Sequence, residues 1–373
     1  MLPSVNIFPV RSIHDLETPV VLVDLDVLER NIARMAERAR TLGVRLRPHA
    51  KTHKVVEVGR RQIAAGATGL SVAKTSEAEV FAAAGFDDLF IAYPVVGADK
   101  ARRLLALAER LRRLAVGVDS VEGASTLASA FRAAGRTLDV VLKIDVGLHR
   151  VGVLPERAAE IARRLADLPG LRLRGIFTHA GQGYHEERPE GVTAVARHEG
   201  STMAAVADEL RRAGIAVEEV SVGSTPTARA AMAQPGVTEC RPGNYVYHDG
   251  SQVALGTCAR EDCALTVLAT VVSVPAPDRA VVDAGSKTLS SDPLRPRPGG
   301  YGQIDGRRSR IQRLSEEHGV IDVEGGDTFR VGERVRILPN HACVVSNLHD
   351  RLFGVRDEAV EAEWRVDARG RVF

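Results

Sequence analysis

The stretch RLRPHAKTHK, residues 45–54, decides how the chain is divided. It joins a short apolar run to Lys51, which has two histidines and a second lysine as neighbours and no carboxylate beside it. Seven further apolar runs follow, separated by amphipathic segments rich in Ala, Leu and Arg. Such alternation predicts repeated βα units. A (β/α)₈ barrel needs eight such units, and we expect the run at 45–49 to be the first of its eight strands.

Each predicted barrel strand is an apolar run that leads into a predicted helix or loop. Strands are expected at 44–49, 68–73, 88–93, 114–119, 139–145, 171–179, 217–223 and 238–244. Helices are expected at 26–41, 54–65, 76–84, 99–112, 121–134, 156–166 and 192–213. One more apolar run, at 20–25, precedes this series and is surplus to a barrel of eight strands. We therefore predict that it pairs with strands of a second domain.

After residue 250 the pattern changes to strands separated by turn signals, with almost no helix. These strands are expected at 264–275, 279–286, 319–323, 333–340 and 361–367. The pattern predicts an antiparallel β-domain. The expected fold class is α/β, a TIM-type (β/α)₈ barrel at 26–250 with a C-terminal antiparallel β-domain made of 1–25 and 251–373.

Composition and charge exclude several classes of protein. Lys+Arg 50 against Asp+Glu 48 leaves a net charge of +2 without a basic block, and aromatic residues are few, so we expect no nucleic-acid partner. The beginning of the sequence has no signal-peptide pattern, and no segment is apolar for the length of a membrane span. These features predict a cytoplasmic protein without a membrane partner. Four cysteines do not make a disulfide framework, and Cys258 and Cys263 are expected to be small buried apolar residues.

Lys51 is the first candidate catalytic residue. In a (β/α)₈ barrel the carboxyl ends of the strands carry the active site, and Lys51 directly follows the first strand. Neighbouring positive charge and desolvation both disfavour an ammonium ion, so the neutral amine becomes available to attack a carbonyl. An exposed lysine at the rim, without a catalytic role, is the alternative interpretation.

If that carbonyl belongs to pyridoxal phosphate, the ends of late strands should supply a phosphate site. The segments VGSTPT (222–227) and RPGNYVYHD (241–249) follow the seventh and eighth predicted strands. Each is an ordinary loop sequence taken alone, but together they place small and hydroxyl-bearing residues on adjacent strands. The candidate phosphate-binding residues are Gly223, Ser224, Thr225, Gly243 and Asn244.

Two further strand ends carry candidate cofactor-binding residues. Arg150 follows the fifth strand, where a guanidinium would contact the phenolate oxygen or stack beside the ring. His179 and Tyr184 follow the sixth, and either would meet the pyridine nitrogen. An ordinary loop role is the alternative for each of the three.

The segment PNHAC (339–343) supplies a candidate metal site. If it continues a strand, His341 and Cys343 share one face and present an imidazole beside a thiolate. This pair suits Zn²⁺, with Mn²⁺ or Mg²⁺ as alternatives, and two protein ligands leave coordination positions open for substrate. His349 or Asp350 would be a further ligand or would support one.

Together, TPVVLVDLD, RPHAKTHK, GLHRVG, VGSTPT, RPGNYVYHD, DAGSKTLSSD and PNHAC resemble the D-threonine aldolase and D-serine dehydratase family, fold type III pyridoxal-phosphate enzymes related to the alanine racemases. The resemblance spans nearly the whole chain. It implies that Lys51 binds the cofactor covalently and that loops 223–225 and 243–244 hold its phosphate. It also implies that His341 and Cys343 hold a divalent metal near the β-hydroxyl of a small D-3-hydroxy amino acid, and that the protein is a homodimer.

The resemblance leaves a choice between reactions. The aldolases usually carry His-x-Asp at the metal position, whereas the D-serine dehydratases carry His-x-Cys, and this chain reads His341-Ala342-Cys343. We therefore expect a lyase that converts D-serine, or another D-3-hydroxy amino acid, into a 2-oxo acid and ammonia. The alternative is a D-threonine or 3-hydroxy-D-amino acid aldolase that yields glycine and an aldehyde or glyoxylate. A racemase would need a second base and no metal pair, and a pyridoxal-phosphate carrier of this fold type would lack the second domain.

Overall fold

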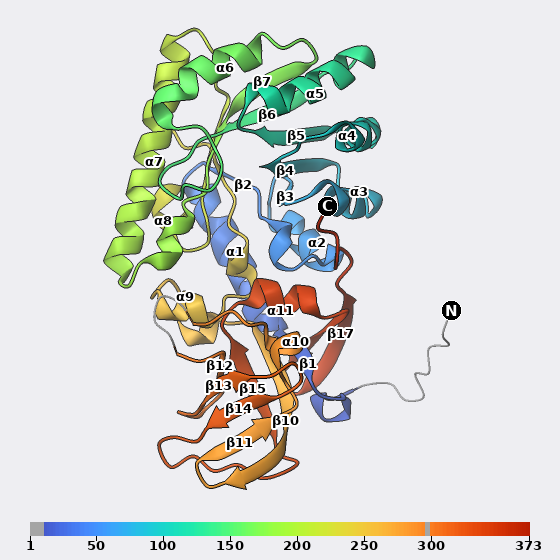
Figure 1. Cartoon of the computed structure of the whole chain (residues 1–373), viewed down its shortest axis with the longest axis vertical. Helices are drawn as coiled ribbons and strands as arrows, with labels where there is room; N and C mark the ends of the chain where they lie inside the picture. The colour runs from blue at the N-terminus through green and yellow to red at the C-terminus, as the bar shows by residue number, and fades with distance from the viewer. Residues whose placement is uncertain (1–10, 295–298) are drawn as a thin grey trace. The chain divides into compact units, whose positions relative to one another are not determined.

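The structure, a computed structural model, describes residues 11–294 and 299–373 (Figure 1). The chain folds into two compact units. The barrel unit comprises Ile32–Tyr245, Leu255–Thr257 and Asp367–Phe373. The β-unit comprises the described residues up to Asn31, with Val246–Ala254 and Cys258–Val366. The unit boundary therefore falls inside the first helix rather than at residue 26, and the last seven residues pack with the barrel.

Eight parallel strands form the sheet of the barrel unit, in the order β2-β9-β8-β7-β6-β5-β4-β3. Their bounds are β2 Arg45–Leu46, β3 Leu70–Val72, β4 Asp88–Pro94, β5 Arg113–Val118, β6 Leu138–Lys143, β7 Leu171–Phe177, β8 Glu219–Val222 and β9 Glu239–Cys240. A parallel bridge from His49 to Ser71 joins the two ends of this order and closes the barrel. The predicted (β/α)₈ barrel, with its first strand at residue 45, is confirmed.

Helices follow most of the barrel strands, close to the predicted ranges. They are α1 Leu25–Thr41, α2 Val56–Ala64, α3 Thr75–Ala83, α4 Ala98–Arg110, α5 Val121–Ala133, α6 Ala158–Ala166, α7 Pro189–Arg212 and the short α8 Ala228–Ala231. Each long helix buries residues at a spacing of three or four, as Ala101, Leu104 and Leu107 of α4 illustrate. Short 3₁₀ turns occupy several strand ends: η2 Ala50–Thr52, η3 Pro155–Arg157, η4 Gly181–His185 and η5 Asn244–Val246.

The β-unit contains nine strands, in the order β11-β14-β13-β12-β15-β10-β1-β16-β17. Their bounds are β1 Val20–Asp24, β10 Leu265–Ala276, β11 Arg279–Val282, β12 Gly302–Ile304, β13 Arg310–Leu314, β14 Gly319–Asp322, β15 Arg334–Pro339, β16 Arg351–Arg356 and β17 Ala359–Arg365. A further pairing of β11 with β10 closes part of this sheet into a ring. The surplus strand at 20–25 joins this sheet, as predicted, between β10 and β16.

Some parts of the β-unit differ from the sequence prediction. β1 pairs with β16 in parallel, so the sheet is not wholly antiparallel. Strands β12, β13 and β16 were not expected. β12 is only three residues long, β13 begins with an arginine, and β16 has an arginine at each end. Short helices also interrupt the sheet: η1 Ile13–Asp15, α9 Gly250–Ala254, η6 Arg260–Asp262, α10 Ser286–Leu289 and α11 Ala342–Leu348. Among the described residues, no helix has both the length and the apolar character that crossing a membrane requires.

Candidate active site

Lys51 lies at the carboxyl end of the first barrel strand. Beyond β2 the chain keeps its pairing with the eighth strand end, because the His49 N–H donates to the Pro242 carbonyl at 2.9 Å. It then turns into η2, where the Nδ1 atom of His49 accepts a hydrogen bond from the Lys51 N–H at 3.4 Å. The side chain of Lys51 is exposed, whereas its neighbour Thr52 is buried. The turn therefore fixes the backbone of Lys51 and leaves its amine accessible.

The loop after β9 packs directly against this turn. A methyl group at Gly243 would stand 2.7 Å from Thr52 Oγ1 and 3.0 Å from the His49 carbonyl oxygen, so only glycine fits there. The same loop meets the loop after β8, because the Tyr245 N–H donates to Thr225 Oγ1 at 3.1 Å. The structure thus brings Lys51 together with both loops that the sequence singled out as phosphate-binding.

Glu199 on α7 determines how the loop after β8 is held. Its Oε1 atom accepts the Gly223 N–H and its Oε2 atom accepts the Thr227 hydroxyl, each at 2.8 Å. Burial raises the pKa of Glu199, although these two hydrogen bonds lower it. The Gly223 N–H, which we expected to face a phosphate, is therefore bound to Glu199. Sequence reasoning missed Glu199. The signal that could have revealed it is its position among the apolar residues of α7, because a buried carboxylate needs a hydrogen-bonding partner.

Lys143, the last residue of β6, is a buried cation that the sequence reasoning missed. Its side chain is 6% exposed, and its amine lies 4.7 Å from the centre of the Phe177 ring. Burial lowers the pKa of Lys143 well below the ordinary value, and the positive charges of Arg241 and Arg150 lower it further. Several positively charged side chains therefore act on the amine of Lys143.

His179 and His49 share this environment. Burial lowers the pKa of His179 well below its ordinary value, and the charges of Lys51 and Lys143 add to the effect. Burial and the charge of Lys51 do the same to the pKa of His49. The surroundings of both rings thus disfavour the imidazolium form. Tyr184 lies on η4, five residues after His179, and is half-buried.

Arg241, the residue directly after β9, is buried in the barrel and was also missed. Its guanidinium donates to the Ser221 hydroxyl and to the Thr178 carbonyl. Burial lowers the pKa of Arg241 despite the opposing charge of Glu239. RPG is an ordinary loop sequence, so only the position of Arg241 at a strand end could have drawn attention to it.

Arg150, in contrast, is exposed on the loop after β6. The Asp145 carboxylate shapes this loop by accepting the N–H groups of Gly147 and His149, at 3.0 and 3.1 Å. It also contacts the His149 ring at 3.1 Å, and His149 has a left-handed φ of 54°. These contacts fix the backbone that carries Arg150.

The charges at this end of the barrel fit a polyanionic cofactor. Lys51, Lys143, Arg150 and Arg241 depress the pKa values of neighbouring bases, while the buried Glu199 is occupied with loop hydrogen bonds. A phosphate group with a phenolate oxygen would relieve the repulsion among these cations. Pyridoxal phosphate carries both groups, so the residues present fit it.

The predicted metal pair lies in the β-unit, but not on a strand. β15 ends at Pro339, His341 is the extended N-cap residue of α11, and Cys343 lies in the first turn of that helix. The expectation of a shared strand face is therefore wrong. The Asp249 carboxylate accepts the Ala342 N–H at 3.0 Å, so a distant segment supplies the cap that begins this helix.

His341 and Cys343 nevertheless come together. Cys343 acts on the charge of the His341 ring, and His341 Nδ1 lies 2.6 Å from the Asp292 carboxylate. Burial opposes an imidazolium, but Cys343, Asp249 and Asp292 together raise the pKa of His341 to about 10. The surroundings thus favour a positive charge, and the imidazole and thiol are good donors for a divalent cation. An Asp that binds Nδ1 would orient the other ring nitrogen toward a metal.

The described residues contain no group of three His, Cys, Asp or Glu side chains that could hold a metal ion. His341 and Cys343 on their own would leave coordination positions open for other ligands. His349 lies with its Nε2 atom 3.3 Å from the Thr288 carbonyl oxygen. An open coordination sphere of this kind is typical of catalytic rather than structural metal sites.

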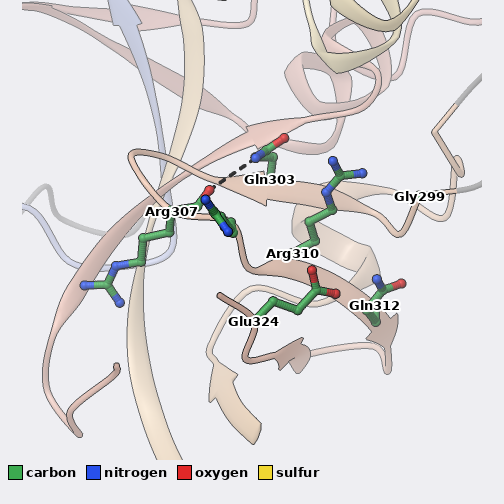
Figure 2. A pocket seen from close by; sticks show the side chains of 7 residues that line it. Gly299, Gln303, Arg307, Arg310, Gln312 and Glu324 are labelled. Carbon is green, nitrogen blue, oxygen red and sulfur yellow. Dashed lines mark hydrogen bonds between the residues drawn. The ribbon is translucent and has the colours of Figure 1, made fainter. Parts of the chain in front are cut away.

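A hollow of about 440 Å³ lies elsewhere in the β-unit (Figure 2). It is lined by Gly299, Gln303, Arg307, Arg308, Arg310, Gln312 and Glu324. Gln303 donates to the Arg307 carbonyl at 3.2 Å, and the Arg307 guanidinium packs 4.2 Å from the Phe329 ring. None of the predicted site residues lines this hollow.

Comparisons with known proteins cover both units. Residues 23–250 match the family model described as alanine racemase, N-terminal domain, and residues 264–355 match a putative serine dehydratase domain. The chain is 42% identical to a D-threo-3-hydroxyaspartate dehydratase of Delftia sp. (strain HT23), over 88% of this chain and 91% of that protein. It is 37% identical to a D-threonine aldolase of Arthrobacter sp., over 95% of this chain and 93% of that protein.

Solved structures agree with these matches. The structure of the Delftia dehydratase is 39% identical and superposes with a TM-score of 0.89, covering 95% of this chain and 98% of that one. Solved variants of a dehydratase of the same name replace a histidine and a cysteine two positions apart by alanine, and the cysteine variant is in a metal-free form. The same spacing separates His341 from Cys343 in this chain.

Proposed function

The chain belongs to the D-serine dehydratase and D-threonine aldolase family of alanine racemase-like enzymes, and from that premise we propose that it is a pyridoxal phosphate- and divalent metal-dependent D-amino acid lyase. The proposed reaction is the dehydration of D-serine, or of another D-3-hydroxy amino acid, to a 2-oxo acid and ammonia. The observation that carries this choice is the position of His341 and Cys343, two residues apart at the start of α11. Their spacing matches the two residues replaced in the dehydratase variants, one of which is metal-free.

The barrel unit would hold the cofactor. Lys51 would bind it covalently, the loops at 223–225 and 243–244 would surround its phosphate, and Arg150 and His179 would contact its ring. Bound pyridoxal phosphate supplies an electron sink for negative charge that develops on the substrate's α-carbon. The concentration of cations at this end of the barrel supports the assignment. We propose His179 rather than Tyr184 as the residue that faces the pyridine nitrogen, because burial and the cations around the His179 ring lower its pKa.

Lys51 would also move the α-proton. Its exposed amine, once freed from the cofactor by the incoming substrate, is the base that takes a proton from the α-carbon. In the β-unit, His341 and Cys343 would hold the metal, with zinc as the favoured ion, and Asp292 would orient the His341 ring. A divalent cation there supplies Lewis acidity for the departing β-hydroxyl.

The substrate class includes D-threo-3-hydroxyaspartate beside D-serine. A dehydratase named for that dicarboxylate shares 42% of aligned residues with this chain. All these substrates carry a D-configured α-carbon and a β-hydroxyl, which are the two groups that the proposed chemistry requires. The active form is proposed to be a cytoplasmic homodimer, as the family resemblance implies.

A second candidate is D-3-hydroxy amino acid aldol cleavage. The observation in its favour is the 37% identity to a D-threonine aldolase over nearly the whole chain. That reaction removes a proton from the β-hydroxyl and breaks the Cα–Cβ bond, giving glycine and an aldehyde. It would use the same lysine and the same metal pair, so only its products distinguish it from dehydration.

The metal requirement tests the proposal. We expect chelation to abolish formation of 2-oxo acid from D-serine, added Zn²⁺ or Mn²⁺ to restore it, and His341→Ala to lower both metal content and turnover by about 100-fold or more. His318→Ala, a substitution of an exposed histidine in the same unit, is the matched control and should leave both unchanged. Full turnover in metal-free His341→Ala would contradict the lyase mechanism and would favour a racemase.

A further inference from the structure

The carboxylate of Asp249 is buried in the β-unit and bonds to the backbone between the two residues of the proposed metal pair. Asp249 is 1% exposed. Its Oδ2 atom accepts the N–H of Ala342, which separates His341 from Cys343, at 3.0 Å. Its Oδ1 atom accepts the Gln252 N–H at 3.1 Å. One side chain therefore ties the beginning of α11 to α9, and Figure 1 shows these two helices as neighbours.

Backbone contacts join the same two segments. The Ser251 N–H donates to the Asn340 carbonyl at 3.3 Å. A methyl group at Gly250 would stand 3.4 Å from Asn340 Oδ1, so the two segments lie in van der Waals contact. Hydrogen bonds thus hold both neighbours of His341, residues 340 and 342, to the segment that begins at Asp249.

The segment that carries Asp249 is itself anchored within the β-unit. The Ala264 N–H donates to the Tyr247 carbonyl at 2.7 Å. The Ala264 carbonyl in turn accepts the N–H of Asp24, the last residue of β1, at 2.8 Å. On the other side, the Val253 N–H donates to the Asp249 carbonyl at 3.1 Å. These bonds connect Asp249 to the sheet of the β-unit, so its carboxylate is held in place against the start of α11.

We propose that Asp249 is a positioning residue for the divalent cation, because it fixes the peptide between His341 and Cys343 before the cation binds. This role rests on the proposed function, in which that pair holds the metal. A fixed backbone leaves less conformational freedom to be lost on binding, so the two donors bind more tightly than they would on a mobile turn. Asp249 acts through the backbone and is not itself assigned as a ligand, since each of its oxygens already accepts an N–H group.

Two substitutions separate positioning from a purely structural role. The Asn side chain of Asp249→Asn has a single acceptor oxygen and no charge, so it keeps one of the two N–H groups, whereas Asp249→Ala keeps neither. Residues that orient metal ligands contribute roughly 10- to 100-fold to metal affinity. We therefore expect the dissociation constant for Zn²⁺ to rise by about 10-fold in Asp249→Asn and by about 100-fold in Asp249→Ala. A residue that only capped α11 would change the free energy of unfolding and leave the zinc affinity of the folded protein unchanged.

The measurement is competition for Zn²⁺ between a chromogenic chelator and the full chain loaded with pyridoxal phosphate. The matched control is Asp327→Ala, because Asp327 of the same unit accepts the N–H groups of Arg308 and Ser309 at 2.9 Å each. That variant also loses two hydrogen bonds from backbone to carboxylate, yet its zinc affinity should equal that of wild type. Excess Zn²⁺ should raise the turnover of Asp249→Asn, as expected when affinity is what the variant has lost.

Two other thiols of the β-unit have to be separated from the proposed pair in this assay. Cys258 and Cys263 are half-buried and neither forms a disulfide, so the expectation that they are buried apolar residues is wrong. His341→Ala leaves both thiols in place, so zinc that stays bound to this variant measures binding outside the pair. Subtracting it gives the affinity of the pair alone.

A measurement on wild type covers the case in which the Asp249 variants do not fold. Hydrogen exchange of the peptide around Ala342 should be slow already without zinc, and zinc should slow it by less than about threefold. A larger effect would show that the metal, rather than Asp249, orders this segment, and would overturn the proposal.

The affinities also distinguish a failure of this role from a failure of the proposed function. Equal zinc affinity of wild type and both Asp249 variants would overturn the positioning role and leave the proposed function standing. Wild type that binds no more zinc than His341→Ala would overturn both, since the pair would then hold no metal.

Discussion

Lys51 is the residue on which the cofactor assignment rests. Replacing it by alanine removes the only amine on the η2 turn, so we predict loss of the visible absorption band that pyridoxal phosphate gains when it is bound to a lysine. Lys100→Ala on α4 is the control and should retain the band. A Lys51→Ala protein that keeps the band would move the cofactor to another lysine, with Lys143 as the next candidate.

A buried ion pair in the barrel core gives a pH-dependent prediction. Arg47 bonds to Glu239 at 2.8 Å and to Asp88 at 2.5 Å. Burial alone would raise the pKa of Glu239, but the charge and hydrogen bond of Arg47 outweigh it and lower the pKa to about 2. Since the folded-state pKa is below the unfolded value of 4.5, the stabilisation is fully present above pH 4.5 and is lost as the pH falls toward 2.

The measurement is the free energy of unfolding of wild type and Glu239→Gln between pH 7 and pH 3. We expect the variant to be less stable at pH 7 by roughly 3–5 kcal/mol, because Arg47 keeps only one partner, and to lose less stability on acidification. The control is Glu218→Gln, which removes the partly exposed ion pair of Glu218 with Arg174. It should change the free energy of unfolding by less than about 1 kcal/mol. Parallel acid curves for wild type and Glu239→Gln would refute the pairing.

Sequence reasoning could place those candidate residues that stand at a strand end. Lys51, Gly243 and Thr225 could be located this way, because parallel strands of a barrel all end at one face. Glu199 could not, since it lies within a helix and reaches the loop only through tertiary packing. Lys143 resembled an ordinary strand residue until the structure showed the other cations around it.

Among the elements, the loop after β9 offers the sharpest test. A methyl group at position 243 would collide with the Lys51 turn, so Gly243→Ala should separate the phosphate loop from that turn. Overpacking of this kind costs roughly 1–3 kcal/mol, which corresponds to pyridoxal phosphate binding about 5- to 150-fold more weakly. Titration of the visible absorption band measures this change.

Gly123→Ala is the matched control for that substitution. Its added methyl group lies in helix α5 and would meet only the Ser120 hydroxyl and the Val96 side chain, at 3.0 and 3.3 Å. Unchanged cofactor affinity is expected there. Equal affinity of Gly243→Ala and wild type would show that the β9 loop does not contribute to the cofactor site.

Element prediction was accurate for the barrel and weaker for the β-unit. The barrel strands and helices follow from periodic apolar patterns that local sequence displays fully. Helix α11 could not be predicted, because its cap comes from Asp249, about ninety positions earlier in the chain. Short strands such as β12 are defined by their partners rather than by their own composition.

On the scale of the whole molecule, the single tryptophan separates the responses of the two units. Trp364 is the only tryptophan, it lies on β17 of the β-unit and it is 7% exposed. Its fluorescence therefore reports unfolding of the β-unit, whereas the absorption of bound pyridoxal phosphate reports the barrel unit. We expect Zn²⁺ at 100 times its dissociation constant to stabilise the tryptophan-monitored transition by about 2.7 kcal/mol.

His341→Ala is the control for that effect and should remove the zinc-dependent increase without lowering the cofactor band. A zinc effect of equal size in His341→Ala would place the metal elsewhere.

The overall fold class and the division into a barrel and a β-domain could be predicted from sequence, because the change from βα units to strands near residue 250 is visible in the pattern. The packing of residues 367–373 with the barrel unit could not be predicted from sequence. It depends on tertiary contacts such as the hydrogen bond that the Val56 N–H donates to the Asp367 carboxylate at 2.7 Å.

We propose that the chain is a D-3-hydroxy amino acid dehydratase. The most direct measurement is product analysis of the zinc- and pyridoxal phosphate-loaded protein with D-serine, D-threo-3-hydroxyaspartate and D-threonine in turn. We expect a 2-oxo acid and an equal amount of ammonia from at least one of these substrates, without glycine. Glycine together with an aldehyde or glyoxylate would contradict it and would establish that His341-x-Cys343 supports aldol cleavage.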